Sequence, residues 1–379
     1  MIMEKENVLW AEDVLKKVTA KMAQVYERSK DKIPYTTVNG VHDDKSVDDI
    51  GWWTNGFWGG IMWLMFNVTG EECYRKTAIE NEEKLDKLFL NYRMLDHDNG
   101  FKWLPTAVAN YKLTKNEESK NRAILAADNL AGRFNSNGEF IRAWNDWDGD
   151  DIDRRGWAII DCMMNLPLLY WASETTNDPR YRQVAVKHAN KALKNFVRED
   201  GSVKHIVEFD VNTGAEVKNY GGQGYKDGSS WTRGQGWGIY GFALSYRHTG
   251  DRNYLKTAEK IADYFISNIP ESGLIPVDFI QPADVTWEDS TASAIAACGM
   301  LEIASFEECS DPDRYRTYGL KLLKALTDSR VNWNENEDDL LLKCTAAFHD
   351  EKHEFSIIYG DFFYIEALCK VAGKGIHMW

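Results

Sequence analysis

Asp161 is the carboxylate whose neighbours most favour acid–base chemistry. It lies between the runs Gly-Trp-Ala-Ile-Ile and Cys-Met-Met-Asn-Leu-Pro-Leu-Leu-Tyr-Trp, which are almost entirely apolar. A carboxyl group in such a setting loses hydration, and this raises its pKa toward the value that a general acid needs near neutral pH. The same residue could instead cap the helix that follows it, and the two roles are compatible.

Three further polar residues stand in places where they could assist this carboxyl group. Asp98 follows His97 in the tract His-Asp-Asn-Gly, a pattern that is more typical of a turn. His97 could orient a substrate or serve as a cap. His205 lies in the candidate strand Val203–Phe209, where a histidine is more often a surface residue.

Arg233 occupies the tract Trp-Thr-Arg-Gly-Gln-Gly-Trp, between Trp231 and Trp237. Glycines allow a ligand to approach the backbone closely, and a guanidinium group held between aromatic rings suits the recognition of a carboxylate. We therefore expect Arg233 to bind an anionic group rather than to be a solvated arginine.

The sequence contains no pattern typical of a metal or cofactor site. The acidic tract Asp146–Asp153 lacks the Gly at position 6 and the Glu at position 12 of an EF-hand. There is no phosphate-binding loop, no His-Glu-x-x-His and no Gly-x-Ser-x-Gly. We expect neither a catalytic metal nor a cofactor.

Composition narrows the classes of partner. The 15 tryptophans, many beside Gly, Asp or Arg, favour stacking platforms for sugar rings or bases, although contacts between helices are the alternative use. A formal net charge of −14 argues against a nucleic-acid partner. An acidic sugar would therefore need a locally basic pocket.

The first residues and the cysteines indicate where in the cell the protein is expected. Glu4, Lys5 and Glu6 stand where a signal peptide would need its apolar stretch, and no run approaches the ~18 apolar residues of a membrane helix. The six cysteines are scattered, and several lie in apolar runs, as buried free thiols do. We expect a cytoplasmic protein with no membrane association and no obligatory protein partner.

A polar connector recurs along the chain and organises it into pairs of helices. Full copies begin at Thr69, Thr176 and Thr249, and looser copies begin at Thr114 and Ser310. An apolar run precedes each full copy, and an amphipathic run of helical period follows it. About twelve helices in about six hairpins would close into an α/α toroid, with an open solenoid as the alternative. We predict one all-α domain over residues 1–379.

Four stretches interrupt the helical pattern with Gly, Trp and charge. In an α/α toroid, the loops from outer to inner helices lie at one end of the barrel, so we expect these stretches to converge on one pocket. The four stretches are Asp48–Gly60, Leu95–Trp103, Ile141–Asp161 and Gly221–Gly238.

Together these tracts resemble the unsaturated glucuronyl hydrolases of glycoside hydrolase family 88. The resemblance rests on WWTNGFWGGIMWL, LDHDNGF, IIDCMMNLPLL, DGSSWTRGQGWGIYGFAL, DSTASAIAACGMLEIAS and IIYGDFFYIEAL, and it covers nearly the whole chain. It implies an (α/α)6 barrel, a general acid/base at Asp161 and a second essential aspartate at Asp98. Asn55 departs from the family pattern, because some members carry Asp there. The substrate-binding residues that the resemblance implies are Trp53, His97, Trp144, His205, Gln223, Arg233 and Trp237.

The chemistry that the resemblance implies is hydration of a vinyl ether. Asp161 would protonate C4 of a 4,5-unsaturated uronic acid, and water would add at C5 to give a hemiketal that opens and releases the remaining sugar. Three alternatives remain: a hydrolase of unsaturated rhamnogalacturonan fragments, an inverting glycosidase with carboxylates about 6.5–9.5 Å apart, and a glycan-binding protein without catalysis.

The resemblance also indicates whether the preferred disaccharide carries a sulfate. Family members that prefer sulfated disaccharides are similar in a Ser-x-x-Ser-x-Lys segment, and the corresponding stretch here, Lys343–Lys352, lacks the paired serines. Asp350 and Glu351 in this stretch would repel a sulfate. We therefore expect a modest preference for unsulfated disaccharides.

Overall fold

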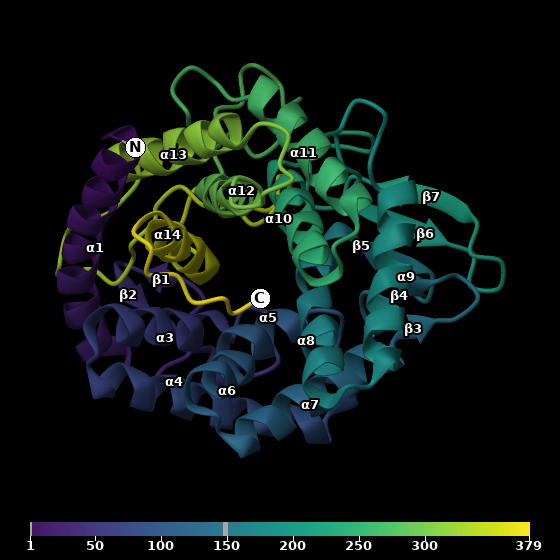
Figure 1. The fold of residues 1–379 in the computed structure, drawn as a ribbon, viewed down its shortest axis with the longest axis horizontal. Coiled ribbons are helices and arrows are strands. Elements are labelled where there is room, and N and C mark those ends of the chain that lie inside the picture. The colour runs from purple at the N-terminus through teal and green to yellow at the C-terminus, as the bar shows by residue number, and fades with distance from the viewer. Residues whose placement is uncertain (1, 147–150) are drawn as a thin grey trace.

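The helices form two concentric rings in the computed structural model, which describes residues 2–146 and 151–379 (Figure 1). The inner ring consists of α3 (Phe57–Thr69), α5 (Asn99–Trp103) with its continuation into α6 (Ala109–Thr114), α8 (Leu166–Thr176), α10 (Thr232–Thr249), α12 (Ser290–Ile303) and α14 (Ile358–Val371). The outer ring consists of α1 (Ile2–Ser29), α4 (Glu72–Lys84), α7 (Glu117–Gly132), α9 (Pro179–Asn195), α11 (Arg252–Ser267) and α13 (Pro312–Ser329).

The inner ring is closed. Helix α3 contacts the π-helical turn Leu104–Val108 between α5 and α6, and this segment contacts α8. The series continues through α10, α12 and α14, and α14 packs back against α3. The outer helix α1 lies against α14, so the two ends of the chain complete the sixth hairpin. The predicted (α/α)6 barrel is confirmed, and the open solenoid is excluded.

Hydrophobic pattern explains which helices lie inside. Every residue of α10 from Thr232 to Tyr246 is buried, as expected for a helix surrounded by others. Helix α11 instead buries one face, and its other positions are polar. The buried positions of α11 include Tyr254, Leu255, Ala258, Ile261, Ala262 and Phe265. The predicted pairing of an apolar inner helix with a polar-faced outer helix is confirmed.

The recurring connector is a specific turn between an inner helix and the next outer helix. The threonine hydroxyl donates to the carbonyl four residues earlier and accepts from the N–H two residues later. The residue between adopts a left-handed conformation, with φ of +76° at Gly70 and +72° at Gly250. An aspartate then caps the outer helix at Asp178 and Asp251. The same threonine contacts occur at Thr69, Thr114, Thr176 and Thr249.

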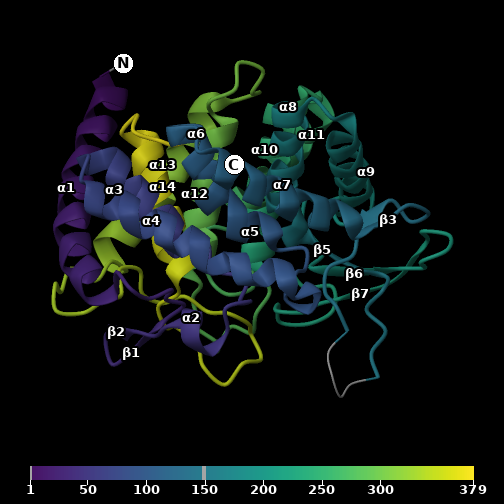
Figure 2. The same cartoon turned by 90° about the horizontal axis from the view of Figure 1, so that it is seen from below.

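Longer loops and small antiparallel sheets occupy the other end of the barrel (Figure 2). The strands are β1 (Thr37–Val38), β2 (Val41–His42), β3 (Phe134–Asn135), β4 (Phe140–Ile141), β5 (Trp157–Ile159), β6 (Ile206–Phe209) and β7 (Glu216–Tyr220). The predicted strand Val203–Phe209 is too long at its start, because Val203 forms an isolated bridge to Val197 instead. Short helical segments in these loops are α2 (Lys45–Asp48) and the 3₁₀ turns Leu85–Leu90, Tyr92–Met94 and Ile160–Met164.

All six cysteines are free thiols, and five of them are buried. Over residues 2–146 and 151–379, no helix is long and apolar enough to cross a membrane. Four positions of the acidic tract Asp146–Asp153, residues 147–150, lie outside the described residues.

Candidate active site

The loops that enter α3, α5, α8 and α10 meet at the long-loop end of the barrel and bring most of the predicted site residues into contact. Aromatic contacts join the four stretches: Trp53 lies against Phe101, Trp144 against His97, and Trp237 against Phe101. The predicted convergence of the four stretches therefore has a direct structural basis. Residues 147–150 of the third stretch are outside the described residues.

Asp161 lies in the 3₁₀ turn Ile160–Met164, immediately before α8. It does not cap α8, because Asn165 occupies that position, so the capping role is wrong. Burial raises the pKa of Asp161 to about 7, although Arg233 and the indole of Trp237 act in the opposite direction. Its side chain is 15% exposed, and Oδ2 has no hydrogen-bond partner among the described residues. A carboxyl group with this pKa can exchange a proton near neutral pH.

Asp98 precedes α5, but its side chain makes no capping hydrogen bond. The turn is instead formed by Asp96, whose Oδ1 accepts from the Asp98 backbone N–H at 2.9 Å. Burial raises the pKa of Asp98 well above its usual range, and the negative charges of Asp96 and Asp161 add to the effect. The Asp98 carboxyl is therefore released from turn formation and faces the site.

Asn165 connects the two aspartates. Its Nδ2 donates to Asp98 Oδ1 at 3.3 Å and to the backbone carbonyl of Asp161 at 3.2 Å. Its Oδ1 accepts from the backbone N–H of Phe101 at 2.8 Å. The sequence alone does not single out Asn165, although it is the one polar residue in the apolar run that follows Asp161.

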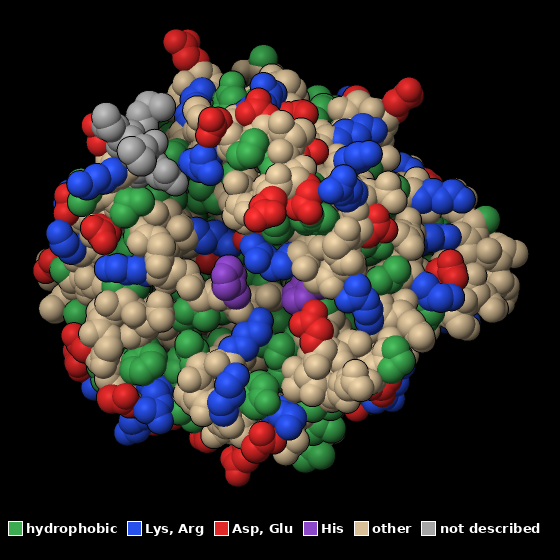
Figure 3. Space-filling model, in the orientation of Figure 1, with side chains coloured by type: hydrophobic (Ala, Val, Ile, Leu, Met, Phe, Trp, Pro, Cys, Tyr) green, Lys and Arg blue, Asp and Glu red, His purple; other side chains and the backbone are tan. Residues whose placement is uncertain are grey.

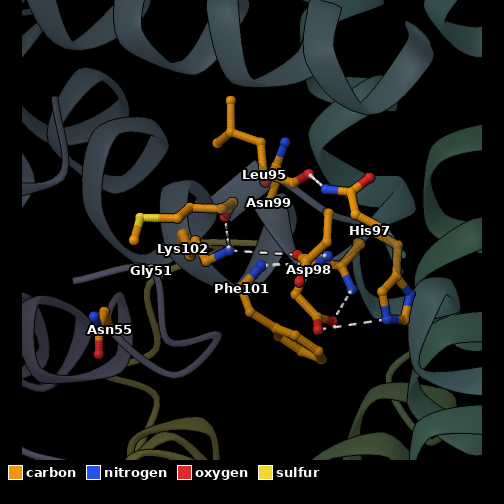
Figure 4. A network of polar contacts seen from close by, with 12 residues as sticks. Gly51, Asn55, Leu95, His97, Asp98, Asn99, Phe101 and Lys102 are labelled. Carbon is orange, nitrogen blue, oxygen red and sulfur yellow. Dashed lines mark hydrogen bonds and ion pairs between the residues drawn. The ribbon is translucent and has the colours of Figure 1, made fainter. Parts of the chain in front are cut away.

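A buried ion pair supports the loop that carries Asp98 (Figure 4). Lys102 has a fully buried side chain, and its Nζ lies 3.3 Å from Asp96 Oδ1 and 3.3 Å from the carbonyl of Met94. The pKa of Asp96 is lowered, because Lys102 and neighbouring cations outweigh the effect of burial. Asp96 and Asp98 are two residues apart, and yet their pKa values move in opposite directions.

His205 is buried rather than on the surface, so the surface interpretation is wrong. Its Nδ1 lies 3.0 Å from the backbone nitrogen of Gln223 and 3.3 Å from the carbonyl oxygen of Gly221. Nε2 lies 3.7 Å from Asp161 Oδ2. Burial lowers the pKa of His205 to about 3, which keeps the ring neutral. A side chain at Gly222 would collide with this ring, because its Cβ would lie 2.1 Å from His205 Nδ1.

His97 is also buried and neutral. Burial lowers the pKa of His97 to about 3, and its Nε2 lies 3.4 Å from Asp98 Oδ2 (Figure 4). Its Nδ1 is buried without a hydrogen-bond partner in the described part of the chain. Trp144, which is half-buried, meets the His97 ring edge to face at 6.2 Å. This pair offers one unused polar atom beside one aromatic surface, as a sugar-binding position requires.

Aromatic rings form the base of the site. Trp53 is half-buried and packs on Phe101 at 5.4 Å and on Tyr359 at 4.9 Å. Trp237 is fully buried against Phe101, and its indole lowers the pKa of Asp161. Trp53 thus has surface that a sugar ring can contact, whereas Trp237 acts on the Asp161 carboxyl.

Arg233 is fully buried, with most of its hydrogen-bonding groups directed into the protein. Its guanidinium pairs with Asp289 and donates to the carbonyls of Thr345 and Ala346. It also lies over the ring of Trp231. Its charge lowers the pKa of Asp161 through space. Asp289, which also caps α12, is a supporting residue that the sequence did not indicate.

The inner helices all begin at this end of the barrel, so their N-termini point toward the site. The N-terminus of a helix carries a partial positive charge, and this favours a bound anion. Arg233 and Lys102 are buried cations near the site, and each is paired with a carboxylate, Asp289 and Asp96 respectively.

Asn55 supports the loop before α3. Its Nδ2 donates to the carbonyls of Asp49 at 3.0 Å and Ile50 at 2.9 Å. An ionised aspartate has no donor for these two carbonyls. The two backbone carbonyls here therefore suit the amide donor of Asn55, which is the residue that departs from the family pattern. Among the described residues, no group of three His, Cys, Asp or Glu side chains is arranged to hold a metal ion.

The model of the family described as Glycosyl Hydrolase Family 88 matches residues 14–302. This chain belongs to glycosyl hydrolase family 88. Like other members of family 88, it is a glycosidase. Its relatives include the unsaturated glucuronyl hydrolase of Bacillus sp. (strain GL1), 39% identical over 326 residues that cover 84% of this chain and 86% of the relative.

A second relative is the unsaturated chondroitin disaccharide hydrolase of Streptococcus pyogenes serotype M1. It is 34% identical over 377 residues, covering 97% of this chain and 93% of the relative. Among solved structures, the unsaturated glucuronyl hydrolase from Bacillus sp. GL1, described as responsible for the degradation of glycosaminoglycan, superposes with a TM-score of 0.88 at 35% identity. That match covers 95% of this chain and 96% of the solved one. Both the fold and the family membership are thus supported over nearly the full length.

Proposed function

We propose that this family 88 glycosidase releases a 4,5-unsaturated uronic acid from the non-reducing end of oligosaccharides that a lyase has cut from glycosaminoglycans. The observation that carries the proposal is Asp161, a buried carboxyl with a pKa of about 7 and an Oδ2 without a partner among the described residues. The names of the two relatives point to the same class of substrate.

Asp161 acts first as acid and then as base. Its proton goes to C4 of the C4=C5 double bond, and positive charge develops at C5 and the ring oxygen. The resulting carboxylate takes a proton from water, whose oxygen bonds to C5. The hemiketal formed in this way opens and releases the remaining sugar. The Nε2 of neutral His205, 3.7 Å from Asp161 Oδ2, faces the carboxylate formed after the first step.

The remaining residues bind and orient the sugar. Trp53 and Trp144 supply partly exposed aromatic surface, and the Nδ1 of His97 supplies a polar contact. Asp98 binds a ring hydroxyl, and its raised pKa favours the protonated form, which can donate a hydrogen bond. Arg233, Trp237 and Gln223 remain predicted binding residues. The Arg233 guanidinium is already bonded to Asp289 and to two backbone carbonyls. We therefore expect it to attract the uronate carboxylate by its charge rather than by two direct hydrogen bonds.

The test is the ultraviolet absorbance of an unsaturated disaccharide, which vanishes when the double bond is hydrated. We expect the absorbance to disappear on addition of the protein. An inverting glycosidase that leaves the double bond intact, or a protein that only binds glycans, would leave the signal unchanged. A faster loss with an unsaturated rhamnogalacturonan fragment than with a chondroitin disaccharide would identify the pectin-directed alternative.

The segment Lys343–Lys352 supports the preference for unsulfated disaccharides. Lys343 Nζ is held by Glu354 at 2.7 Å, and Thr345 donates to the carbonyl of Glu288 at 2.7 Å. His349 Nε2 lies 2.7 Å from the carbonyl of Tyr225. These donors are engaged within the protein. The check is kcat/KM on a pair of disaccharides that differ only in a 6-sulfate, where we expect the unsulfated member to be faster by roughly 5–150-fold, the ratio for about 1–3 kcal/mol.

We further propose that residues 1–379 act as one catalytic domain, because α1 packs against α14 and completes the ring. Six free thiols support a reducing compartment such as the cytoplasm.

A further inference from the structure

Asn165 occupies the junction between the two elements that carry the aspartates. It follows the 3₁₀ turn that holds Asp161, and it precedes α8. Its side chain is fully buried, and its hydrogen bonds are all made to residues of these two elements. The two N–H groups reach Asp98 and the carbonyl of Asp161, and the oxygen receives the N–H of Phe101.

The backbone around Asn165 leaves room for this residue and little else. At Gly100, a Cβ would lie 2.5 Å from Asn165 Cα and 2.6 Å from its Oδ1. Helix α5 therefore begins pressed against Asn165, and an N–H of its first turn, which has no partner within the helix, is satisfied by Oδ1. An aspartate here would keep this acceptor but lose both donors, and an alanine would lose all three hydrogen bonds.

We propose that Asn165 is a positioning residue that fixes the Asp98 carboxyl relative to Asp161, so that the two aspartates work as one unit. This inference rests on the proposed function, because it assigns the pair to the same reaction. Asn165 acts through the aspartates and does not itself touch the substrate.

The charged and titratable groups around the pair set the expected effect on pH dependence. The Asn165 donor lowers the pKa of Asp98, in opposition to burial. Without this donor, Asp98 holds its proton to a higher pH, whereas the alkaline limb of the rate, which follows Asp161, stays in place. Mere loosening of the site would instead admit water and lower both pKa values. The other groups that act on Asp98 and Asp161 are Asp96, His97, Lys102, Arg133, Cys162, His205 and Arg233.

The experiment compares Asn165→Ala with Asn110→Ala, a matched change elsewhere in the barrel. Asn110 is also buried, and its Nδ2 also donates twice, to Glu82 and Ser119. We expect Asn165→Ala to lower kcat by about 10- to 100-fold, to change KM by less than about threefold, and to leave the alkaline limb of the pH–rate profile, which follows Asp161, in place. Asn110→Ala should lose thermal stability but keep kcat and its pH profile.

A double-mutant cycle with Asp98→Asn completes the test. If Asn165 acts through Asp98, its effect on kcat should largely disappear in the Asp98→Asn background. Equal effects in both backgrounds, a wild-type kcat for Asn165→Ala, or a downward shift of the alkaline limb would overturn the inference. Asn165→Asp keeps the Phe101 contact and replaces the alanine variant if that variant does not fold. Activity that survives Asp161→Asn would instead show that the proposed function is wrong, whatever Asn165 does.

Discussion

At the end of the barrel opposite the active site, Glu302 is as deeply buried as Asp98, and yet its pKa moves the other way. Glu302 pairs with Arg247 and, at 2.7 Å, with Lys370. These two cations outweigh the effect of burial and lower the pKa of Glu302 to about 2. Asp161 has no such pair of cations among the described residues, and its pKa rises to about 7.

Cationic side chains gather around Glu302 at its end of the barrel. Figure 3 shows Lys, Arg and His side chains around a central hollow at the end where the inner helices finish. A cavity of about 540 Å³ lies there, with Arg247, Glu302, Lys370 and His377 in its wall. Trp379 closes the bore by donating to Glu366 at 3.0 Å and stacking on Phe363. At the long-loop end, Asp161 Oδ2 and His97 Nδ1 are buried without a partner in the part of the chain that the structure describes, and such an atom also occurs near the other end, at His248 Nε2.

The comparison teaches that burial alone does not make a catalytic carboxyl. A buried carboxylate that is paired with cations is a structural anchor, whereas one held by hydrogen bonds and a distant charge retains its proton. The unpaired groups at the active end lower stability, and that cost is consistent with a site built to receive a ligand.

The largest expected effect is on catalysis. Asp161→Asn should lower kcat by at least about 10²- to 10⁴-fold, because it removes the proton donor while keeping the size of the side chain. The matched change Glu302→Gln should leave kcat within about threefold. Both are measured as the loss of disaccharide absorbance per mole of folded protein. Activity of Asp161→Asn within tenfold of wild type would contradict the assignment.

The same two substitutions should affect stability in the opposite way to catalysis: Glu302→Gln should lower it and Asp161→Asn should raise it. Glu302→Gln leaves Arg247 without its carboxylate and Lys370 with only Glu366, at 3.8 Å, so we expect a loss of about 3–5 kcal/mol in the free energy of unfolding. The pKa of Asp161 is raised in the folded state, so the stability it contributes is present below about pH 4 and lost as pH rises through about 7.

Asp161→Asn should therefore gain roughly 1–3 kcal/mol at pH 8, where wild-type Asp161 is charged. Urea unfolding of both variants at pH 8 is the measurement. A loss of stability in Asp161→Asn would mean that its carboxylate is paired in solution.

The rate should depend on pH through Asp161. Because the protonated form is the acid, kcat/KM should fall about tenfold per pH unit above the pKa of about 7. A profile from pH 5 to pH 9 measures this, and Glu302→Gln should show the same alkaline limb. A flat profile across this range would show that proton donation by Asp161 does not limit the rate.

The smallest expected effects are those of substitutions at Gly222 and Gly250, two glycines that both have a positive φ. Gly222→Ala places a methyl group against His205, so we expect kcat/KM to fall by about tenfold, or ~1.4 kcal/mol. Gly250 has φ of +72°, and a methyl group added there would meet no described atom within 4 Å, so Gly250→Ala should cost only about 1 kcal/mol of stability. Steady-state kinetics and thermal unfolding of both variants decide the point. Equal kinetics would show that the His205 ring can shift without cost.

Much of the architecture follows from local pattern. The 3.6-residue period in the runs after Thr176 and Thr249 predicts the outer helices, and the connector predicts where each inner helix ends. Both signals work because helix amphipathicity and left-handed turns depend on residues close together in the chain. Asp161 stands out for the same reason, since its apolar neighbours are its sequence neighbours.

The sequence by itself thus determined the hairpins and the strongest acid candidate. Only the tertiary structure decided that the ring of hairpins closes, that Arg233 is committed to Asp289, that His205 is buried beside Asp161, and that Asn165 joins Asp98 to Asp161. The reason is physical. Whether a buried carboxyl keeps its proton depends on which cations and donors reach it, and here they come from segments tens of residues away.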